Sequence, residues 1–193
     1  MKLDSRRSES LNTRANIRRR RGDLAGARSD YEASLALNSK DSYALAGRGG
    51  LLASSDPAAA MRDFNEAIAS NPKMPEAYSG RANLRAADGD FVGALADFDT
   101  AISLSPRDGN LIVGRGIIRS ASRDFAAAIR DYDRALEVDP RNAFAYANRA
   151  LAHQARGEKD AAIADFEAAL SLAPENWPER ATVVEMLKRL RAE

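Results

Sequence analysis

The clearest alternation of apolar and polar positions runs through residues 143–176. In its second half, apolar residues recur at helical spacing, as at Ala162 and Phe166. Gly157 interrupts the segment and Pro174 ends it, so the pattern predicts two helices joined by a tight turn. Strands would need alternation with a period of two, which no segment of the chain shows.

The second helix of this pattern occurs five times in the chain. Each copy carries a small, an aromatic and another small residue at offsets of zero, four and seven, which places all three on one helix face. The sets are Ala27/Tyr31/Ser34, Ala60/Phe64/Ala67, Ala94/Phe98/Ala101, Ala128/Tyr132/Ala135 and Ala162/Phe166/Ala169. A fixed period of 33 or 34 residues predicts one supersecondary unit stacked on copies of itself, and hence one continuous array.

An arginine on the first helix and an aspartate on the second follow the same period. The pairs are Arg14 and Asp30, Arg48 and Asp63, Arg81 and Asp97, Arg115 and Asp131, and Arg149 and Asp165. Catalytic carboxylates need an environment that sets one group apart from the others, and a pair present in every copy lacks one. Because the two helices of a copy are antiparallel, we predict a structural ladder of partly buried Arg–Asp ion pairs.

The positions of these arginines and aspartates within the period set the expected boundaries of the repeats. We expect an N-terminal extension at 1–7, repeats at 8–41, 42–74, 75–108, 109–142 and 143–176, and a C-terminal capping helix within 177–193. Gly22, Gly89 and Gly157 are expected to supply the positive φ of turns between helices. The second copy is one residue short between its Arg and Asp, which we interpret as a trimmed turn. The last helix is predicted from Glu179 to Ala192, with an apolar stripe.

The repeat resembles the tetratricopeptide repeat family over about residues 8–176. The resemblance rests on the small residue after each arginine, the small–aromatic–small set, and the proline after four of the five second helices. One position departs from the family, because an aromatic or large apolar residue of the first helix is replaced here by Arg18, Leu52, Arg85, Arg119 and His153. The resemblance implies an all-α, right-handed α-solenoid of antiparallel helix pairs.

The resemblance also implies that the first helices line a concave groove in which a partner lies as an extended segment or a helix. Its positions are Glu9, Asn12, Asn16 and Arg19; Tyr43, Ala46, Gly50 and Ala53; Glu76, Ser79, Asn83 and Ala86; Asn110, Val113, Ile117 and Ser120; and Phe144, Ala147, Leu151 and Gln154. We expect Asn12, Asn16, Arg19, Tyr43, Asn83, Val113, Ile117, Phe144, Leu151 and Gln154 to contact the partner.

Four of these residues, Val113, Ile117, Phe144 and Leu151, are apolar and lie in successive copies. We expect them to form a contiguous exposed patch, because apolar clusters on a surface often mark interfaces. The alternative is that some of the four belong to the core between helices.

Composition narrows the possible chemistry. The chain has no Cys and a single His, His153, which excludes thiolate nucleophiles and metal clusters of recognised spacing. The glycines at 47–50 fall within a helical phase and lack the Lys-Ser/Thr of a phosphate-binding loop. We therefore expect no enzymatic activity, no cofactor and no metal.

Charge is concentrated at the N-terminus. Residues 1–21 carry eight Lys or Arg against two acidic residues, a net +6; the whole chain is +1, so the remainder carries −5. The run from Arg18 to Arg21 has two interpretations. It could bind nucleic acid or an acidic polymer, or it could be the solvated end of a helix. No aromatic residues interleave with it, so nucleic-acid binding is the weaker interpretation. Self-assembly through the uncapped first repeat is a further alternative.

The chain shows no targeting or spanning segment by pattern. No stretch approaches the roughly 18 apolar residues of a transmembrane helix, and the first residues lack the apolar region of a secretory signal. The default expectation is a cytoplasmic protein, with a secreted or periplasmic mature form, or a fragment of a longer protein, left open. The predicted function is that of a non-catalytic adaptor that binds a peptide or protein segment in its groove.

Overall fold

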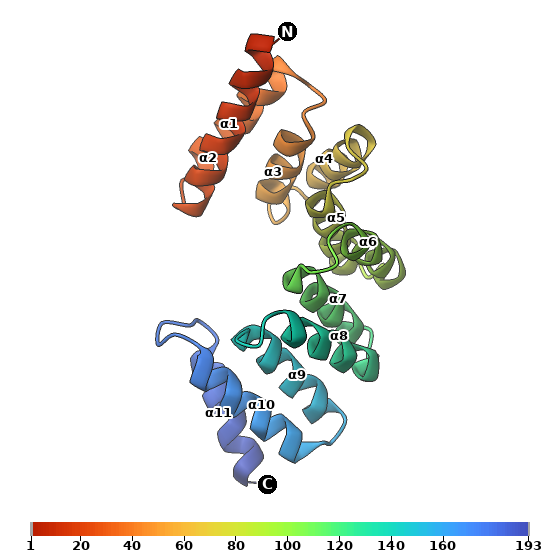
Figure 1. Ribbon diagram of the computed structural model, residues 1–193, viewed down its shortest axis with the longest axis vertical. Coiled ribbons are helices and arrows are strands. Elements are labelled where there is room, and N and C mark those ends of the chain that lie inside the picture. Colours follow the sequence, from red (N-terminus) through yellow and green to blue (C-terminus); the bar gives the residue numbers. More distant parts are fainter. Residues whose placement is uncertain (1, 193) are drawn as a thin grey trace. The chain divides into compact units, whose positions relative to one another are not determined.

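The computed structural model describes residues 2–192, which form eleven α-helices and no strand (Figure 1). The helices are α1 (Lys2–Arg20), α2 (Leu24–Leu37), α3 (Ser42–Leu52), α4 (Pro57–Ser70), α5 (Pro75–Ala87), α6 (Phe91–Leu104), α7 (Gly109–Ala121), α8 (Phe125–Val138), α9 (Ala143–Ala155), α10 (Lys159–Leu172) and α11 (Arg180–Ala192). They group into an N-terminal unit that ends at Leu104 and a C-terminal unit that begins at Ser105. The all-α fold predicted from the sequence is confirmed, whereas the single array is divided between α6 and α7.

Within each unit, every helix packs on the next one along the chain, as in an α-solenoid. Side chains at the turns start most of the second helices. Asp23, Asp56, Asp90 and Asp124 each accept a hydrogen bond at 2.8–3.0 Å from a backbone N–H three residues ahead. This cap satisfies one of the N–H groups that a helix start leaves without an intrahelical partner.

The turns between paired helices use the expected glycines. Gly22, Gly89 and Gly157 have φ of 82°, 84° and 77°, which confirms the predicted positive φ. Arg123 takes the equivalent place in the fourth pair with φ of 65°. The short second copy was interpreted wrongly as a trimmed turn. The second copy is shorter because α3 is shorter, with 11 residues where α5 has 13. The connection from α3 to α4 spans residues 53–56 and is not shortened.

The core of the N-terminal unit is built from the small–aromatic–small sets. Tyr31 and Phe64 are buried with the small residues that flank them on the same helix face. Each ring also lies against a glycine of the next helix, since a Cβ built on Gly47 would be 2.3 Å from Tyr31 Cζ, and one on Gly80 would be 2.3 Å from Phe64 Cζ. The two glycines therefore let α3 and α5 approach the preceding helices closely.

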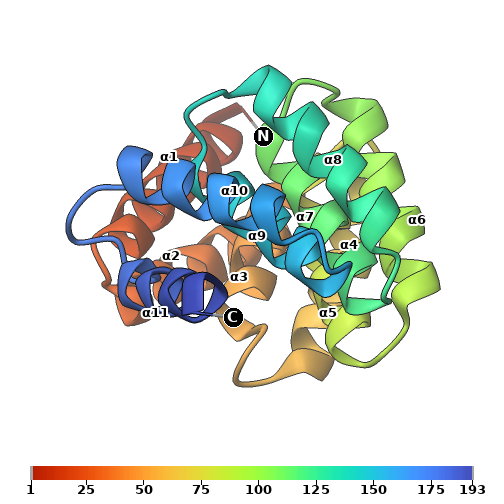
Figure 2. The same ribbon diagram turned by 90° about the horizontal axis from the view of Figure 1, so that it is seen from below.

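The C-terminal unit ends with a covering helix. Figures 1 and 2 both show α11 beside α10, where Val183, Leu187 and Leu190 join the core cluster around Phe166. Exposed charged residues alternate with these apolar ones, so α11 buries one face and presents the other to solvent. At the other end of the chain, α1 already begins at Lys2, so residues 2–7 continue a helix and form no separate extension.

Candidate functional site

Each arginine–aspartate pair of the sequence pattern is joined by two hydrogen bonds. In every pair the arginine Nε donates to Oδ2, at 2.8–3.0 Å, and Nη2 donates to Oδ1, at 2.5–2.7 Å. The aspartates are 2–6% exposed, so the carboxylates lie inside the helix pairs. Such paired, parallel hydrogen bonds are charge-assisted and geometrically specific. The arrangement braces the first helix against the second, once in each repeat.

The charges shift the titration of both partners. The hydrogen bond from Arg14 is the largest influence on Asp30 and holds its pKa below the ordinary value, against the opposing effect of burial. On the other side, the hydrogen bond to Asp97 raises the pKa of Arg81. Both shifts favour the charged forms of the groups concerned, Asp30 and Arg81.

A second cation reaches most of these carboxylates, which the sequence reasoning missed. Arg18, Arg85 and Arg119 approach Oδ2 of Asp30, Asp97 and Asp131 through Nη1, at 2.9, 2.8 and 2.8 Å. These arginines occupy the position that departs from the tetratricopeptide pattern. The available signal was their spacing of four residues from the first arginine, which places both on one helix face.

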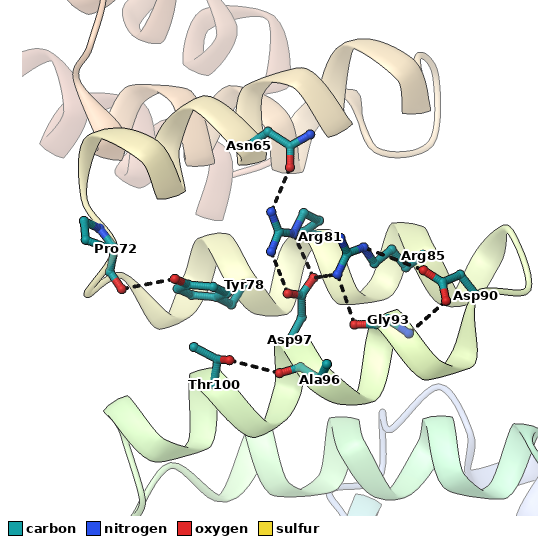
Figure 3. A network of polar contacts seen from close by, with 10 residues as sticks. All are labelled: Asn65, Pro72, Tyr78, Arg81, Arg85, Asp90, Gly93, Ala96, Asp97 and Thr100. Atoms are coloured by element: carbon teal, nitrogen blue, oxygen red, sulfur yellow. Dashed lines mark hydrogen bonds and ion pairs between the residues drawn. The ribbon is translucent and has the colours of Figure 1, made fainter.

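Figure 3 shows this arrangement in the third pair, α5 and α6. Arg81 also extends Nη1 to Oδ1 of Asn65 on the preceding helix α4, at 2.8 Å. Arg149 makes the same kind of contact with Asp133, at 2.6 Å. One guanidinium thus joins its own helix pair to the second helix of the preceding repeat.

A groove of about 530 Å³ lies in the N-terminal unit, between its first helices α1, α3 and α5. Its lining comprises Asn16, Arg19, Arg20, Tyr43, Ala46, Gly47, Gly50, Phe64, Met74, Glu76, Ser79, Gly80 and Asn83. Of the residues expected to contact a partner, the groove brings together Asn16, Arg19, Tyr43 and Asn83. The sequence reasoning did not include Phe64 and Met74 in the groove: it placed Phe64 on the buried face of a second helix, and Met74 is the residue that precedes α5.

The groove has a polar, donor-rich end on α1. The buried Tyr31 hydroxyl donates to Asn16 Oδ1 at 2.9 Å, which leaves the Asn16 amide N–H groups directed to other partners. Arg19 and Arg20 add two cations, and Glu76 on α5 supplies an acidic group elsewhere in the lining. Tyr43 is 62% exposed and provides a large, accessible ring. The lining can therefore hydrogen-bond a polypeptide, attract acidic groups and contact an apolar side chain.

Asn12, also expected in the groove, lies in the interior instead. It is 8% exposed, and its Nδ2 donates to Asp41 Oδ2 at 2.9 Å. Ser8 and Ser34 donate to the same carboxylate oxygen, so the three side chains tie α1 and α2 to the start of α3. The groove assignment of Asn12 was wrong because its amide is hydrogen-bonded to Asp41, the residue that caps the start of α3.

The apolar patch expected in the C-terminal unit is not continuous. Val113 is 3% exposed and lies in the core, so its assignment to the surface was wrong. Ile117 is half-buried, while Phe144 and Leu151 are 42% and 40% exposed on α9. Gln154 is also exposed, at the end of the same helix. What remains of the patch is two large apolar side chains spaced two helical turns apart.

The basic run at the end of α1 is divided among different roles. Arg18 is held by Asp30, whereas Arg19 and Arg20 line the groove and Arg21 is exposed at the turn. Within residues 2–192, no three His, Asp or Glu side chains are grouped so that they could hold a metal ion. None of the helices in that range is both long and apolar enough to cross a membrane.

Solved structures with the same fold are numerous. The pilus biogenesis factor PilW aligns with a TM-score of 0.86 at 18% identity, over 96% of this chain and 86% of its own. A thermophilic TPR protein of Thermus thermophilus aligns with a TM-score of 0.78 at 17% identity, over 96% of this chain and 100% of its own. YrrB, described as a TPR protein with an unusual peptide-binding site, aligns with a TM-score of 0.68 at 17% identity, over 93% and 90% of the two chains.

No sequence among the curated proteins matches this chain. Two family models do match it, both described as tetratricopeptide repeat, over residues 50–109 and 115–192. Together they cover more than half of the sequence, and the helix pairs and the aligned structures agree with them. The chain belongs to the tetratricopeptide repeat family, whose repeats generally serve as non-catalytic modules for protein–protein interaction.

Proposed function

We propose that this protein is a non-catalytic adaptor that binds an extended segment of a partner protein in the groove of its N-terminal unit. The observation that carries the proposal is the groove itself, which is lined by the first helices of three consecutive repeats. YrrB, which shares the fold, is described as having a peptide-binding site, and this supports the same class of ligand.

The lining favours a segment of particular chemistry. Asn16 and Asn83 suit hydrogen bonds to the polypeptide backbone, because amides donate and accept in the same plane. Arg19 and Arg20 favour acidic side chains at the α1 end. Tyr43 offers its exposed ring to an apolar or aromatic side chain, and such rings are frequent anchors in interfaces. We therefore expect a segment that combines an aromatic or aliphatic residue with nearby acidic residues.

Selection from a random peptide library displayed on phage, with the whole chain as bait, tests the proposal. Selected peptides should share the acidic–apolar composition, and their affinity should fall about tenfold or more in a Tyr43→Ala variant. Asn83→Ala should weaken the same peptides, while both variants keep the helical circular dichroism of the parent.

A double variant of Phe144→Ala and Leu151→Ala serves as the matched control, since it removes the exposed apolar residues of α9. The proposal requires that this change leave the affinity unaltered. If the C-terminal variant abolishes binding and Tyr43→Ala does not, the partner site lies on α9 and the groove assignment is wrong.

A further inference from the structure

The second cation in the helix pairs occupies a site with a defined set of acceptors. In the third pair, Arg85 Nη1 lies 2.8 Å from Asp97 Oδ2 and 3.2 Å from the Gly93 carbonyl oxygen, while Nε lies 3.8 Å from Asp90 Oδ2 (Figure 3). The site thus joins the aspartate of the second helix, a carbonyl of that helix's first turn and the aspartate that caps it. These three acceptors together form a binding site for a guanidinium group.

The same site is filled in the first pair. Arg18 Nη1 lies 2.9 Å from Asp30 Oδ2 and 3.2 Å from the Gly26 carbonyl oxygen, and Nε lies 3.7 Å from Asp23 Oδ2. The distances differ from those around Arg85 by no more than 0.1 Å. Two repeats with different side chains elsewhere therefore hold a guanidinium in the same way.

The C-terminal unit fills the site as well. In the fourth pair, Arg119 Nη1 lies 2.8 Å from Asp131 Oδ2 and 3.4 Å from the Ala127 carbonyl oxygen. In the fifth, His153 takes the position, with Nδ1 at 2.6 Å from Glu158. Each of these repeats places a nitrogen-bearing side chain of its own first helix at this position.

The second helix pair has no such nitrogen-bearing side chain, because Leu52 occupies the position that an arginine or histidine takes in the other pairs. All three acceptor positions are nevertheless present, as Asp56, Ala59 and Asp63, and all three residues line one cavity of about 260 Å³. Asp63 is 5% exposed. Its Oδ2 accepts a bond from Arg48 Nε, whereas Asp97 Oδ2 accepts from both Arg81 and Arg85. Asp63 Oδ2 therefore accepts one fewer hydrogen bond from arginine than Asp97 Oδ2 does.

The other charged residues of the cavity do not fill this position. Arg28 pairs with Glu32 at 2.8 Å, and Arg48 is the first-helix partner of Asp63. Arg62 is exposed and makes no ion pair with the residues that the structure describes. Glu32 and Asp63 are therefore each paired with an arginine, and Asp56 is the third carboxylate that lines the cavity. The cavity is thus open and provides the acceptors that a guanidinium uses in the neighbouring repeats.

We propose that this cavity binds the guanidinium group of an arginine side chain from a partner protein. Arginine fits better than lysine because its planar fork can address several acceptors at once, as Arg18 and Arg85 do, whereas an ammonium is a point charge. The site shares no residue with the groove, so the two proposals stand or fall separately.

The test uses N-acetyl-arginine amide as the probe and the whole chain labelled with nitrogen-15. Saturable shifts of the Asp56, Ala59 and Asp63 amide signals are expected at millimolar probe. N-acetyl-lysine amide should bind more weakly, and the uncharged N-acetyl-citrulline amide should not bind. Equal shifts from the citrulline compound, or no saturable shift from the arginine compound, would overturn the proposal.

Asp56→Asn removes the charge but keeps the helix cap, because Asn is as good an N-cap as Asp. It should weaken the probe about tenfold, as expected for the loss of a charged hydrogen-bond partner. Asp90→Asn is the matched control, because Arg85 already occupies the equivalent site of the third pair. This variant should leave the affinity for the probe unchanged. Equal affinities in the two variants would contradict the assignment.

Two further variants separate the site from its alternatives. Leu52→Arg supplies a donor from within and should abolish binding of the probe. Arg62→Ala removes a neighbouring cation and should preserve or strengthen binding. If Arg62→Ala instead abolishes binding, or if acetate produces the same shifts as the arginine probe, the cavity is an anion site and the proposal is wrong.

Discussion

The ring of Tyr31 on α2 fills the space that a side chain at Gly47 on α3 would occupy. A Cβ at Gly47 would lie 2.3 Å from Tyr31 Cζ and 2.7 Å from its hydroxyl oxygen. Real Cβ atoms do not approach neighbours so closely, and Tyr31 is fully buried and cannot move aside without repacking. The same ring orients Asn16 in the groove, so one contact serves both the core and the candidate site.

Substitution of Gly47 by Ala is therefore expected to destabilise the protein by about 1–3 kcal/mol through overpacking. Gly50→Ala is the matched control on the same helix, because a Cβ at Gly50 meets no atom within 4 Å. It should stabilise by up to about 1 kcal/mol, since Ala favours a helix interior over Gly. Urea unfolding midpoints measure both, and equal midpoints for the two variants would contradict the close contact.

Loss of an arginine from the ladder should cost more where the aspartate has no second cation. Arg48→Ala leaves Asp63 buried without a partner, because Leu52 occupies the second position, and should destabilise by about 3–5 kcal/mol. Arg81→Ala leaves Asp97 paired with Arg85 and should cost about 1–3 kcal/mol.

Chemical denaturation compares these variants with Lys73→Ala, an exposed residue on the turn before α5. The lysine change should stay within about 0.5 kcal/mol. Adding Asp63→Asn to Arg48→Ala should recover part of the loss, because the stranded charge is removed. An Arg81→Ala variant as stable as the lysine control would show that the pairs do not brace the helices.

Removal of the Tyr31 hydroxyl should affect the groove more than the fold. Tyr31→Phe frees Asn16 to rotate, so peptides selected against the groove should bind about threefold to tenfold more weakly. Tyr132→Phe is the control, since the Tyr132 hydroxyl lies 3.3 Å from Ser120 in the C-terminal unit. Isothermal titration calorimetry distinguishes them, and an equal loss in both variants would exclude a role for Asn16.

Acid should weaken the junction of α1, α2 and α3 through Asp41. Burial by itself would raise the pKa of Asp41, but hydrogen bonds from Ser8, Asn12, the Ala44 N–H and Ser34 outweigh it and hold the pKa below its ordinary value. The stabilisation is therefore present above the ordinary carboxyl pKa of about 4 and is lost as the pH falls through the lower folded value.

Asp41→Asn keeps the cap on α3 but replaces one acceptor oxygen by a donor. It should destabilise by about 1–3 kcal/mol at pH 7, because buried donors lose their partner. Urea midpoints at pH 7 and at pH 2 measure the difference between the variant and the parent. That difference should shrink in acid, and a constant difference would mean that the charge of Asp41 contributes nothing.

Much of the fold could be predicted because its signals are local and repeated. The small–aromatic–small sets mark buried faces wherever they occur, as Tyr31 and Phe166 show. The spacing of Arg14 from Asp30, repeated along the chain, indicates which side chains face one another across a helix pair. The second cation was within reach of the same reasoning, because Arg85 follows Arg81 by one helical turn.

The sequence by itself determined the helices, their phase and the partners within each pair, since helical periodicity, caps and turns depend on neighbours a few residues away. Tertiary structure decided which groove positions are open. Val113 and Tyr43 were both assigned to the groove, yet one is buried and the other exposed, because their burial depends on side chains from other helices. The unfilled acceptors beside Leu52 likewise emerge only when repeats are compared in space. Packing between repeats sets these differences, and a repeating sequence pattern alone does not contain them.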